Sequence, residues 1–394
     1  MADHFTPVCR PDDTQAALQD SLRRWLGRNT PFDRRAGLLA SPTAVLPAWE
    51  RLVDELGLLA AGQPESAGGI GEGVNGGMAD QALILQALGE ALLPEPYAAV
   101  LVLAGGLLRA LPGPTAAGLL AALVAGTARP VLAAREPGAR HHLDAVQASL
   151  QGPAGALRLS GRKTGVRAAA LATHWLVTAR AAGGHLALAL VQPDAPGVQR
   201  RDVPLADGSW ACELGFDQTP VAGLLDLPAA GLLPALLQAQ DDCLLATGAE
   251  AVGVMQRLMR DTQDHLRQRR QFGVPLASFQ VLQHRLADMH LDLIQASALV
   301  GATLQRLPGL SHSAGHAHER QRAVASAQVA VARACRSVGQ GAVQLHGGMG
   351  VTDELAVGHA FKRLTLIAAQ GGGIDGQLRR VAAATTLSGE FPCL

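Results

Sequence analysis

The sequence predicts a mainly helical α+β protein. It divides into an N-terminal α-helical domain over residues 1–127, a middle antiparallel β domain over 128–230 and a C-terminal four-helix bundle over 231–394. Three observations support this division: apolar residues first recur with helical spacing, short apolar runs punctuated by prolines follow, and long helical stripes fill the last part. A chain of 394 residues is also too long for one ordinary hydrophobic core.

In the first domain, helices are predicted after an Asp13-Thr14 cap, over Trp49–Leu58 and over Met78–Leu92. The glycine-rich segment Pro64–Gly71 is a loop by composition. The core face of the first helix is predicted to carry Ala17, Leu18, Leu22 and Leu26.

In the middle domain, Thr173–Arg180 and His185–Val191 are apolar runs joined through Gly183-Gly184, which predicts a β-hairpin.

The bundle is predicted from four helices. The first carries an apolar stripe at Leu245, Ala249, Val252, Met259 and Leu266. The second, after Pro275 and a Ser278 cap, carries a stripe at Leu282, Leu286, Met289, Leu293, Ala296, Val300 and Leu304. The third covers Glu319–Leu345, and the fourth covers Glu354–Ala384 with an interruption at Gly371–Gly373.

Composition narrows the class of protein. The formal net charge is zero, so nothing favours nucleic acid or an anionic membrane surface as a partner. The five cysteines are scattered, which indicates reduced thiols rather than a disulfide framework. The segment Met1–His4 shows no signal pattern, and the apolar run Ala98–Leu108 is too short to span a bilayer. We therefore expect a soluble, cytoplasmic protein.

The first segment that suggests chemistry is Arg269–Pro275, RRQFGVP, where one long helix ends and the next begins. The Arg269 guanidinium could clamp a pyrophosphate, the Phe272 ring could cover a purine, and Gly273 could stop the helix. The alternative is a basic last turn that complements the helix dipole and is followed by an ordinary turn.

The second segment is Gln344–Val351, QLHGGMGV. Glycines at a helix exit let the backbone approach a cofactor, and the Gln344 amide could hydrogen-bond to it. The alternative is an ordinary glycine cap at the end of a helix.

Together and in this order, the two segments resemble the R-x-Q-F-G turn and the Q-x-x-G-G-x-G loop of the acyl-CoA dehydrogenase family. Pro64–Gly71 is similar to the family's P-E-x-x-G-G-x-G loop, and Glu136-Pro137 fits as well, so the resemblance spans nearly the whole chain. In that family both segments hold the ADP end of an FAD bound mainly by a neighbouring subunit. The cofactor-binding residues that the resemblance implies are Arg269, Gln271, Phe272, Gly273, Gln280, Gln344, Gly347 and Gly348.

The resemblance implies oxidation of an acyl-CoA thioester to the 2-enoyl-CoA, as in β-oxidation of fatty acids or steroid side chains, with an electron-transfer flavoprotein as acceptor. A carboxylate would take the Cα proton while a hydride moves to the flavin.

The usual positions of that carboxylate do not carry an acid. They fall on Gly371 and, for a minority of the family, on Cys243. The weak candidates nearby are Asp375 and Asp242, each of which is more often a solvated or helix-capping acid.

The flavin-ring motifs also depart from the family. Arg135 precedes Glu136-Pro137, Arg140-His141 follows, and Lys163–Arg167 replaces a motif with Trp and Thr. Only the ADP-half signatures are intact, so the chain resembles the small subunit of a two-component dehydrogenase of the pimeloyl-CoA or steroid type, whose catalytic partner subunit supplies the base. The alternatives are a self-sufficient homotetramer with an atypical base, a non-catalytic scaffold or regulatory homologue, and a flavin monooxygenase or oxidase on the same fold.

Two further patterns are rejected. Gly71–Gly76 matches G-x-G-x-x-G, but no strand precedes it. His312, His316 and His318 lie in a polar loop without further ligands, so we expect no metal site.

Overall fold

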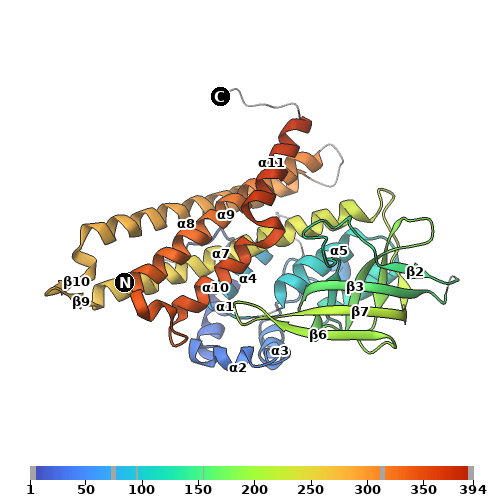
Figure 1. Ribbon diagram of the computed structural model, residues 1–394, viewed down its shortest axis with the longest axis horizontal. Helices are drawn as coiled ribbons and strands as arrows, with labels where there is room; N and C mark the ends of the chain where they lie inside the picture. Colours follow the sequence, from blue (N-terminus) through green and yellow to red (C-terminus); the bar gives the residue numbers. More distant parts are fainter. Residues whose placement is uncertain (1–5, 72–76, 95, 154, 311–315, 389–394) are drawn as a thin grey trace. The chain divides into compact units, whose positions relative to one another are not determined.

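The computed structural model describes residues 6–71, 77–94, 96–153, 155–310 and 316–388 (Figure 1). The segment Met1–His4, most of Gly71–Gly76, His312 and Cys393 lie outside the described residues. By its internal contacts the chain splits into two compact units. We name them the helical unit, made of Met1–Arg34, Met78–Leu93 and Leu244–Leu394, and the sheet unit, made of Arg35–Gly77 and Pro94–Cys243. The three-domain division stays a prediction.

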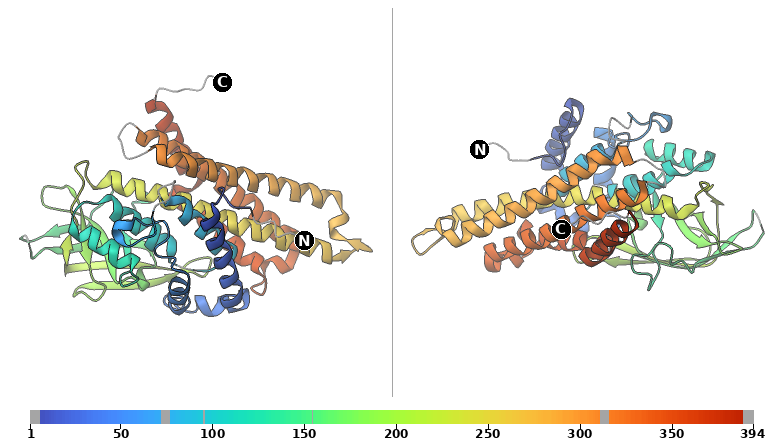
Figure 2. Two further views of the ribbon diagram at one scale, coloured as in Figure 1. Left: turned by 180° about the vertical axis from the view of Figure 1, so that it is seen from behind. Right: turned by 90° about the horizontal axis from the view of Figure 1, so that it is seen from above.

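The helical unit contains the predicted bundle together with two N-terminal helices. Its elements are α1 (Asp13–Asn29), η1 (Phe32–Arg34), α4 (Met78–Glu90), most of α7 (Leu232–Gln268), β9 (Arg270–Gln271), β10 (Val274–Pro275), η5 (Leu276–Ser278), α8 (Gln280–Arg306), η6 (Leu307–Leu310), α9 (Ala317–His346), η8 (Gly347–Val351), α10 (Ala356–Ala368), η9 (Gln370–Gly372) and α11 (Gly373–Ser388). The α8 and α9 helices lie side by side (Figures 1 and 2).

Helix α7 is the centre of the helical unit, because its predicted stripe is fully buried and its glycines allow close packing. A Cβ at Gly253 would lie 1.9 Å from the Gln86 carbonyl oxygen of α4, and one at Gly89 would lie 2.3 Å from the Glu250 carbonyl oxygen. Helices approach this closely only where side chains are absent from the contact. The glycines therefore fix how α4 crosses α7.

The structure corrects the predicted cap and core face of α1. The cap is Asp12 rather than Asp13-Thr14, since Asp12 and Gln15 form a reciprocal capping box with bonds of 2.8 and 3.0 Å. Ala17 is exposed and Leu18 only half-buried, because the buried face is turned toward Gln19, Leu22, Trp25 and Leu26. Gln19 is accommodated there by donating to the Leu83 carbonyl at 3.4 Å.

The bundle prediction is confirmed with one correction. Ser278 does not cap α8: its hydroxyl donates to the Pro275 carbonyl at 2.6 Å, and the residue before the helix is Phe279, which has no side-chain cap bond. The interruption at Gly371–Gly373 is confirmed, because Gly371 has a φ of 59° and separates α10 from α11.

The sheet unit combines short helices with an eight-stranded sheet of order β6-β7-β3-β2-β4-β5-β8, in which β1 pairs with β4. Its helices are α2 (Arg35–Leu39), α3 (Leu46–Leu56), η2 (Glu65–Ala67), the π-helix η3 (Ala98–Ala104), α5 (Gly105–Ala110), α6 (Pro114–Val124) and η4 (Ala169–Leu171). Its strands are β1 (Pro130–Ala133), β2 (Ser149–Gln151), β3 (Arg158–Arg167), β4 (His174–Arg180), β5 (Leu186–Val191), β6 (Val198–Pro204), β7 (Trp210–Pro220) and β8 (Gly223–Leu224).

The predicted hairpin is confirmed as the antiparallel pair β4–β5, with Thr178 opposite Leu188. The sheet is not purely antiparallel, however, since β1 and β2 both pair with β4 in parallel. The chain between β1 and β4, residues 134–173, is long enough to return to the same end of the sheet, which parallel pairing requires. Strand spacing in the sequence does not reveal such a return.

Among the described residues, none of the helices has the length and apolarity needed to cross a membrane.

Candidate cofactor site

The Arg269–Pro275 segment forms a tight hairpin at the end of α7. Strands β9 and β10 pair antiparallel, with Gln271 opposite Val274. The two residues between them, Phe272 and Gly273, have φ values of 55° and 80°. A two-residue turn with both central φ values positive matches the twist of a β-hairpin, but it is unusual for an aromatic residue. Gly273 therefore serves this turn and does not stop the helix, which is a correction, because α7 already ends at Gln268.

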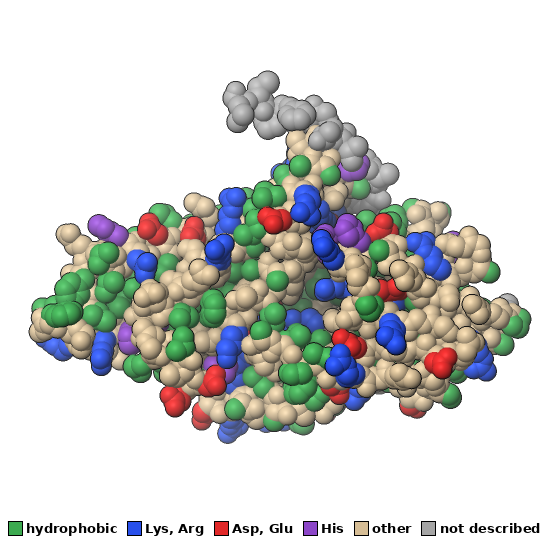
Figure 3. Space-filling model, in the orientation of Figure 1, with side chains coloured by type: hydrophobic (Ala, Val, Ile, Leu, Met, Phe, Trp, Pro, Cys, Tyr) green, Lys and Arg blue, Asp and Glu red, His purple; other side chains and the backbone are tan. Residues whose placement is uncertain are grey.

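This hairpin turns the Phe272 side chain into solvent. Phe272 is 90% exposed, although its ring meets that of Phe279 edge-on at 6.2 Å. Val274, the residue that follows Gly273, is also exposed, and neighbouring exposed apolar side chains are typical of a surface that binds another molecule. Hydrophobic side chains gather over β9 and β10 at the left of Figure 3.

Two arginines stand side by side in this segment and differ in what they bind. The Arg270 guanidinium donates to the Gly273 carbonyl at 2.9 Å and stabilises the turn. Within the part of the chain that the structure describes, the exposed Arg269 guanidinium has neither a hydrogen bond nor an ion pair, while its backbone is held by His265 and Leu276. Arg269 thus has a fixed backbone and a side chain available to an anion.

The Gln344–Val351 segment leaves the end of α9 as η8. Gly347 has a φ of 62°, which only glycine adopts at little cost, and a Cβ at Gly350 would lie 2.8 Å from the Val343 carbonyl oxygen. Gly348 differs from both, since its φ is not positive and a Cβ there would meet nothing within 4 Å. The fold therefore gives no reason for a glycine at 348, whereas close approach of another molecule would.

The structure brings the two segments together through a pair of histidines. The rings of His265, in the last turns of α7, and His346, the last residue of α9, stack with centroids 4.3 Å apart and planes at 26°. The His346 Nδ1 donates to the Ala342 carbonyl at 2.9 Å. Burial, then His346, then Arg269 lower the pKa of His265 below its ordinary value, which favours the neutral ring.

These residues fit the ADP portion of a flavin nucleotide. An unpaired guanidinium suits a pyrophosphate, an exposed aromatic ring suits a purine, and the open backbone at Gly348 suits close approach. Gln344, also exposed, and Gln280, the exposed first residue of α8, add amide groups to the same helical unit. The Gln271 amide already donates to the Arg270 carbonyl at 2.9 Å, so only its oxygen is unused by that bond.

The main expected position of the catalytic carboxylate is closed. A Cβ at Gly371 would lie 2.3 Å from Gln377 Nε2 and 3.0 Å from Leu244 Cδ1. Gln377 is 1% exposed, and its amide donates to the Gly371 carbonyl at 2.8 Å. The space where a glutamate would begin is therefore filled by side chains of this chain.

The other candidate bases differ in exposure and surroundings. Cys243 is half-buried, and its thiol lies 3.7 Å from the Ala98 carbonyl oxygen. Asp242 is 7% exposed. Asp375 is exposed in the first turn of α11, where a carboxylate complements the helix dipole.

The Glu136-Pro137 motif has a structural role that sequence reasoning missed. The Glu136 carboxylate accepts a 2.6 Å bond from Lys163 Nζ and further bonds from the Gln147 and Ala148 amides at 2.8 and 3.1 Å. Lys163 also donates to Thr178 Oγ1 at 2.9 Å and to the Ala134 carbonyl at 3.3 Å. Burial lowers the pKa of Lys163, and the bond to Glu136 opposes that shift. The feature of the sequence that could have revealed this ion pair is Lys163, a lysine within a segment of β spacing.

The other residues that the sequence analysis singled out have no assigned role in the cofactor site. Arg135 and Arg140 are exposed, so neither bears the cost of a buried, unpaired guanidinium. His316 and His318 lie at the start of α9.

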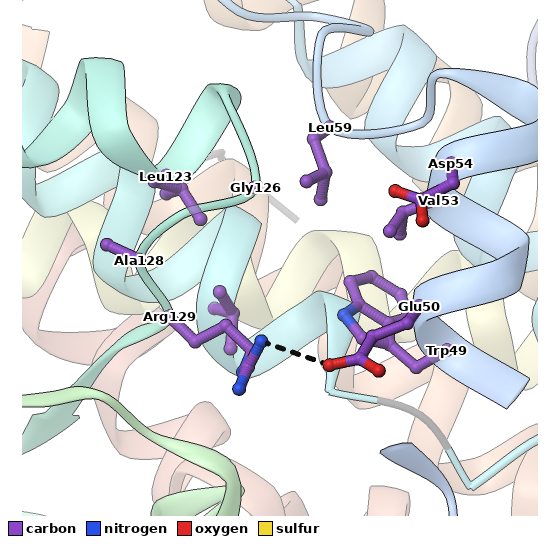
Figure 4. Close-up of a pocket in the computed structure, with 10 residues that line it drawn as sticks. Trp49, Glu50, Val53, Asp54, Leu59, Leu123, Gly126, Ala128 and Arg129 are labelled. Carbon is purple, nitrogen blue, oxygen red and sulfur yellow. Dashed lines mark ion pairs between the residues drawn. The ribbon is translucent and has the colours of Figure 1, made fainter. Parts of the chain in front are cut away.

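A pocket in the sheet unit contains none of the predicted site residues. It has a volume of about 220 Å³, and the Glu50 carboxylate at its edge faces the Arg129 guanidinium at 3.6 Å (Figure 4). Apolar side chains such as Val53 and Leu123 line its wall. Pockets for small molecules usually exceed about 300 Å³. We therefore do not assign binding of the flavin or of the substrate to this pocket.

The chain is similar in sequence to known proteins over most of its length. Residues 245–386 match the family model "Acyl-CoA dehydrogenase, C-terminal domain". The chain is 30% identical over 346 residues to the acyl-CoA dehydrogenase FadE27 of Mycobacterium tuberculosis, which covers 84% of this chain and 86% of that protein.

Two solved structures show the same fold. The structure of the ChsE4-ChsE5 complex from Mycobacterium tuberculosis superposes with a TM-score of 0.84 at 24% identity, covering 98% of this chain and 99% of that chain. A glutaryl-CoA dehydrogenase from Mycobacterium smegmatis in complex with FADH2 gives a TM-score of 0.83 at 17% identity, covering 96% of each. At these identities the structural likeness supports the fold alone.

Proposed function

This chain belongs to the acyl-CoA dehydrogenase family, and from that premise we propose that it is one subunit of an FAD-dependent acyl-CoA dehydrogenase that forms a 2-enoyl-CoA. In this proposal it contributes the ADP-binding half of an FAD site shared with a catalytic partner subunit. The observation that carries the proposal is the exposed Arg269 guanidinium, which has no partner among the described residues. It lies one helical turn after His265, whose ring stacks on that of His346, the residue before the open backbone of Gly347 and Gly348.

In the assembled site, Arg269 would bind the pyrophosphate, Phe272 would cover the adenine, and Gln344 with Gly347 and Gly348 would contact the adenosine side. FAD, when bound, supplies the acceptor for the hydride that leaves the β-carbon of the thioester. This chain's part is to bind and orient the nucleotide, so its contribution is positional.

The catalytic base would come from the partner. The position of the usual glutamate is Gly371, and the buried Gln377 and Leu244 occupy the space around it. That the similar ChsE4-ChsE5 structure is a complex of two named chains supports a two-component arrangement. We further propose that the electrons pass to an electron-transfer flavoprotein, and that the assembly works in the cytoplasm.

The test is FAD retention by the purified assembly, measured for the wild type and for Arg269→Ala. Loss of a charge-assisted contact costs about 1.5–3 kcal/mol, so FAD should bind roughly ten- to a hundredfold more weakly. Arg51→Ala is the control, because this surface arginine, 58% exposed, lies in α3 of the sheet unit and pairs with Glu55 one turn along the same helix.

Two results would contradict the proposal. Unchanged FAD retention in Arg269→Ala would remove the assigned role of this residue. A chain that is yellow when purified alone, and whose flavin is bleached by an acyl-CoA, would instead support a self-sufficient dehydrogenase with an atypical base.

A further inference from the structure

We propose that His265 and His346 form a positioning pair whose stacked rings hold the two nucleotide-contacting segments together, so that removing either ring weakens FAD binding although neither histidine contacts the cofactor. This inference rests on the proposed ADP-binding role. It concerns residues that the two sequence signatures do not use for binding.

Each histidine lies next to a segment with predicted cofactor contacts. His265 lies one helical turn before Arg269, and its carbonyl accepts the Arg269 backbone N–H at 2.9 Å. His346 lies two residues after Gln344 and immediately before Gly347. A shift of either ring therefore acts on a backbone that carries a predicted cofactor contact.

Beyond the stack, each helix end continues into an exposed segment. The α7 helix continues into the exposed β9–β10 hairpin, and α9 continues into η8, whose Gly347 and Gly348 are exposed. Each helix is anchored locally by a buried leucine next to the histidine, Leu266 at 0% and Leu345 at 6% exposure. These anchors bury each helix, while the stack joins the last turns of α7 and α9 directly.

The His346 ring is itself held in place. His346 is 7% exposed, and its bond to the Ala342 carbonyl fixes the plane of the imidazole. Because the ring centroids of the two histidines stay 4.3 Å apart, the two segments are already in position before a nucleotide binds to both of them. Such preorganisation reduces the ordering cost of binding.

The experiment measures FAD affinity of the assembly with its catalytic partner subunit, by fluorescence titration of the apoprotein. His265→Leu and His346→Leu each replace an imidazole ring by an apolar side chain, so that the two rings no longer stack. Each should weaken FAD binding roughly two- to tenfold, since an aromatic pair contributes modestly beyond its burial. The double variant should lose no more than the weaker-binding single variant, because both changes remove the same contact.

The conservative variant His265→Phe separates positioning from general damage. It keeps a ring against His346, so FAD affinity should return to within about twofold of the wild type. His185→Ala, an exposed histidine in the β4–β5 turn, is the matched control and should change nothing. Wild-type affinity in both leucine variants, additive losses in the double variant, or failure of His265→Phe to restore binding would each overturn the proposal.

Arg269→Ala, measured in the same series, distinguishes the two levels of inference. If Arg269→Ala releases FAD but the leucine variants retain it, the positioning pair is wrong and the ADP-binding role stands. If Arg269→Ala itself retains FAD, the ADP-binding role is wrong, and the positioning pair that rests on it is withdrawn too.

Discussion

Two glycine turns of the helical unit, both at helix ends and both with positive φ, have opposite surroundings. At the end of α9, a Cβ on Gly347 or Gly348 would meet nothing within 4 Å. Between α10 and α11, a Cβ on Gly371 would meet Gln377 at 2.3 Å and Leu244 at 3.0 Å. The first turn is therefore open to another molecule, whereas the second is filled by side chains of this chain.

Two cationic side chains differ in the same way, one being open to another molecule and the other enclosed by the chain. Arg269 projects from its hairpin with no partner among the described residues, while Lys163 in the sheet unit has three acceptors for its three protons. Groups whose partners lie inside the chain should matter for folding, and groups without such partners should matter for binding. The predictions below test this rule.

The largest expected effect is on a fully satisfied group. Lys163→Met should destabilise the protein by about 3–5 kcal/mol, because it leaves the Glu136 carboxylate buried without its cation. Urea denaturation would measure the loss. Lys362→Met is the control, since its ion pair with Asp353, 3.3 Å long, is exposed, and it should cost less than about 1 kcal/mol. Equal effects at the two lysines would break the contrast.

The filled turn should not accept a base. Gly371→Glu should cost about 2–4 kcal/mol, from the positive φ and from crowding against Gln377 and Leu244, and should not create acyl-CoA-dependent bleaching of the flavin. Gly373→Ala isolates the backbone part, since Gly373 also has a positive φ, 64°, but a Cβ there would be 3.6 Å from its nearest neighbour. Dehydrogenation by the Gly371→Glu chain alone would contradict the comparison.

The open turn should behave in the opposite way. Gly348→Ala should change the free energy of unfolding by no more than about 0.5 kcal/mol but should weaken FAD binding about tenfold, because the added methyl separates backbone and nucleotide. Gly118→Ala in α6 is the control, an exposed helical glycine with nothing within 4 Å of its Cβ, and FAD binding should not change there. A Gly348→Ala protein that is destabilised yet binds FAD normally would reverse our assignment.

The smallest effect expected is a pH dependence from His265. Its pKa is lowered in the folded protein from the ordinary 6.5, so the unfolded chain binds the proton first as the pH falls. The stability from the neutral ring is complete above pH 6.5 and declines below it until the native pKa is reached. The difference between wild type and His265→Phe in denaturation at pH 5 and pH 8 isolates this contribution. Parallel pH profiles for the two proteins would exclude it.

Much of the fold was predictable because it depends on local spacing. The α9 prediction, Glu319–Leu345, lies within the observed Ala317–His346, and the break at Gly371–Gly373 follows from three consecutive glycines. The errors were also local in kind. The sequence places the cap of α1 at Asp13-Thr14, one residue after the observed Asp12, and predicts a helix stop at Gly273, which instead lies in a β-turn.

The order of helical and β segments, the family resemblance and the absence of an acid at position 371 were predictable from the amino-acid sequence, since each depends on residue identity and near neighbours. Which distant residues meet could be seen only in the folded chain. The stack of His265 on His346, the pairing of Lys163 with Glu136 and the filling of the Gly371 turn by Leu244 and Gln377 all depend on packing between segments far apart in the chain. Periodicity fixes which face of a helix is buried, but not which neighbour covers that face, and that choice is made by the packing of the whole unit.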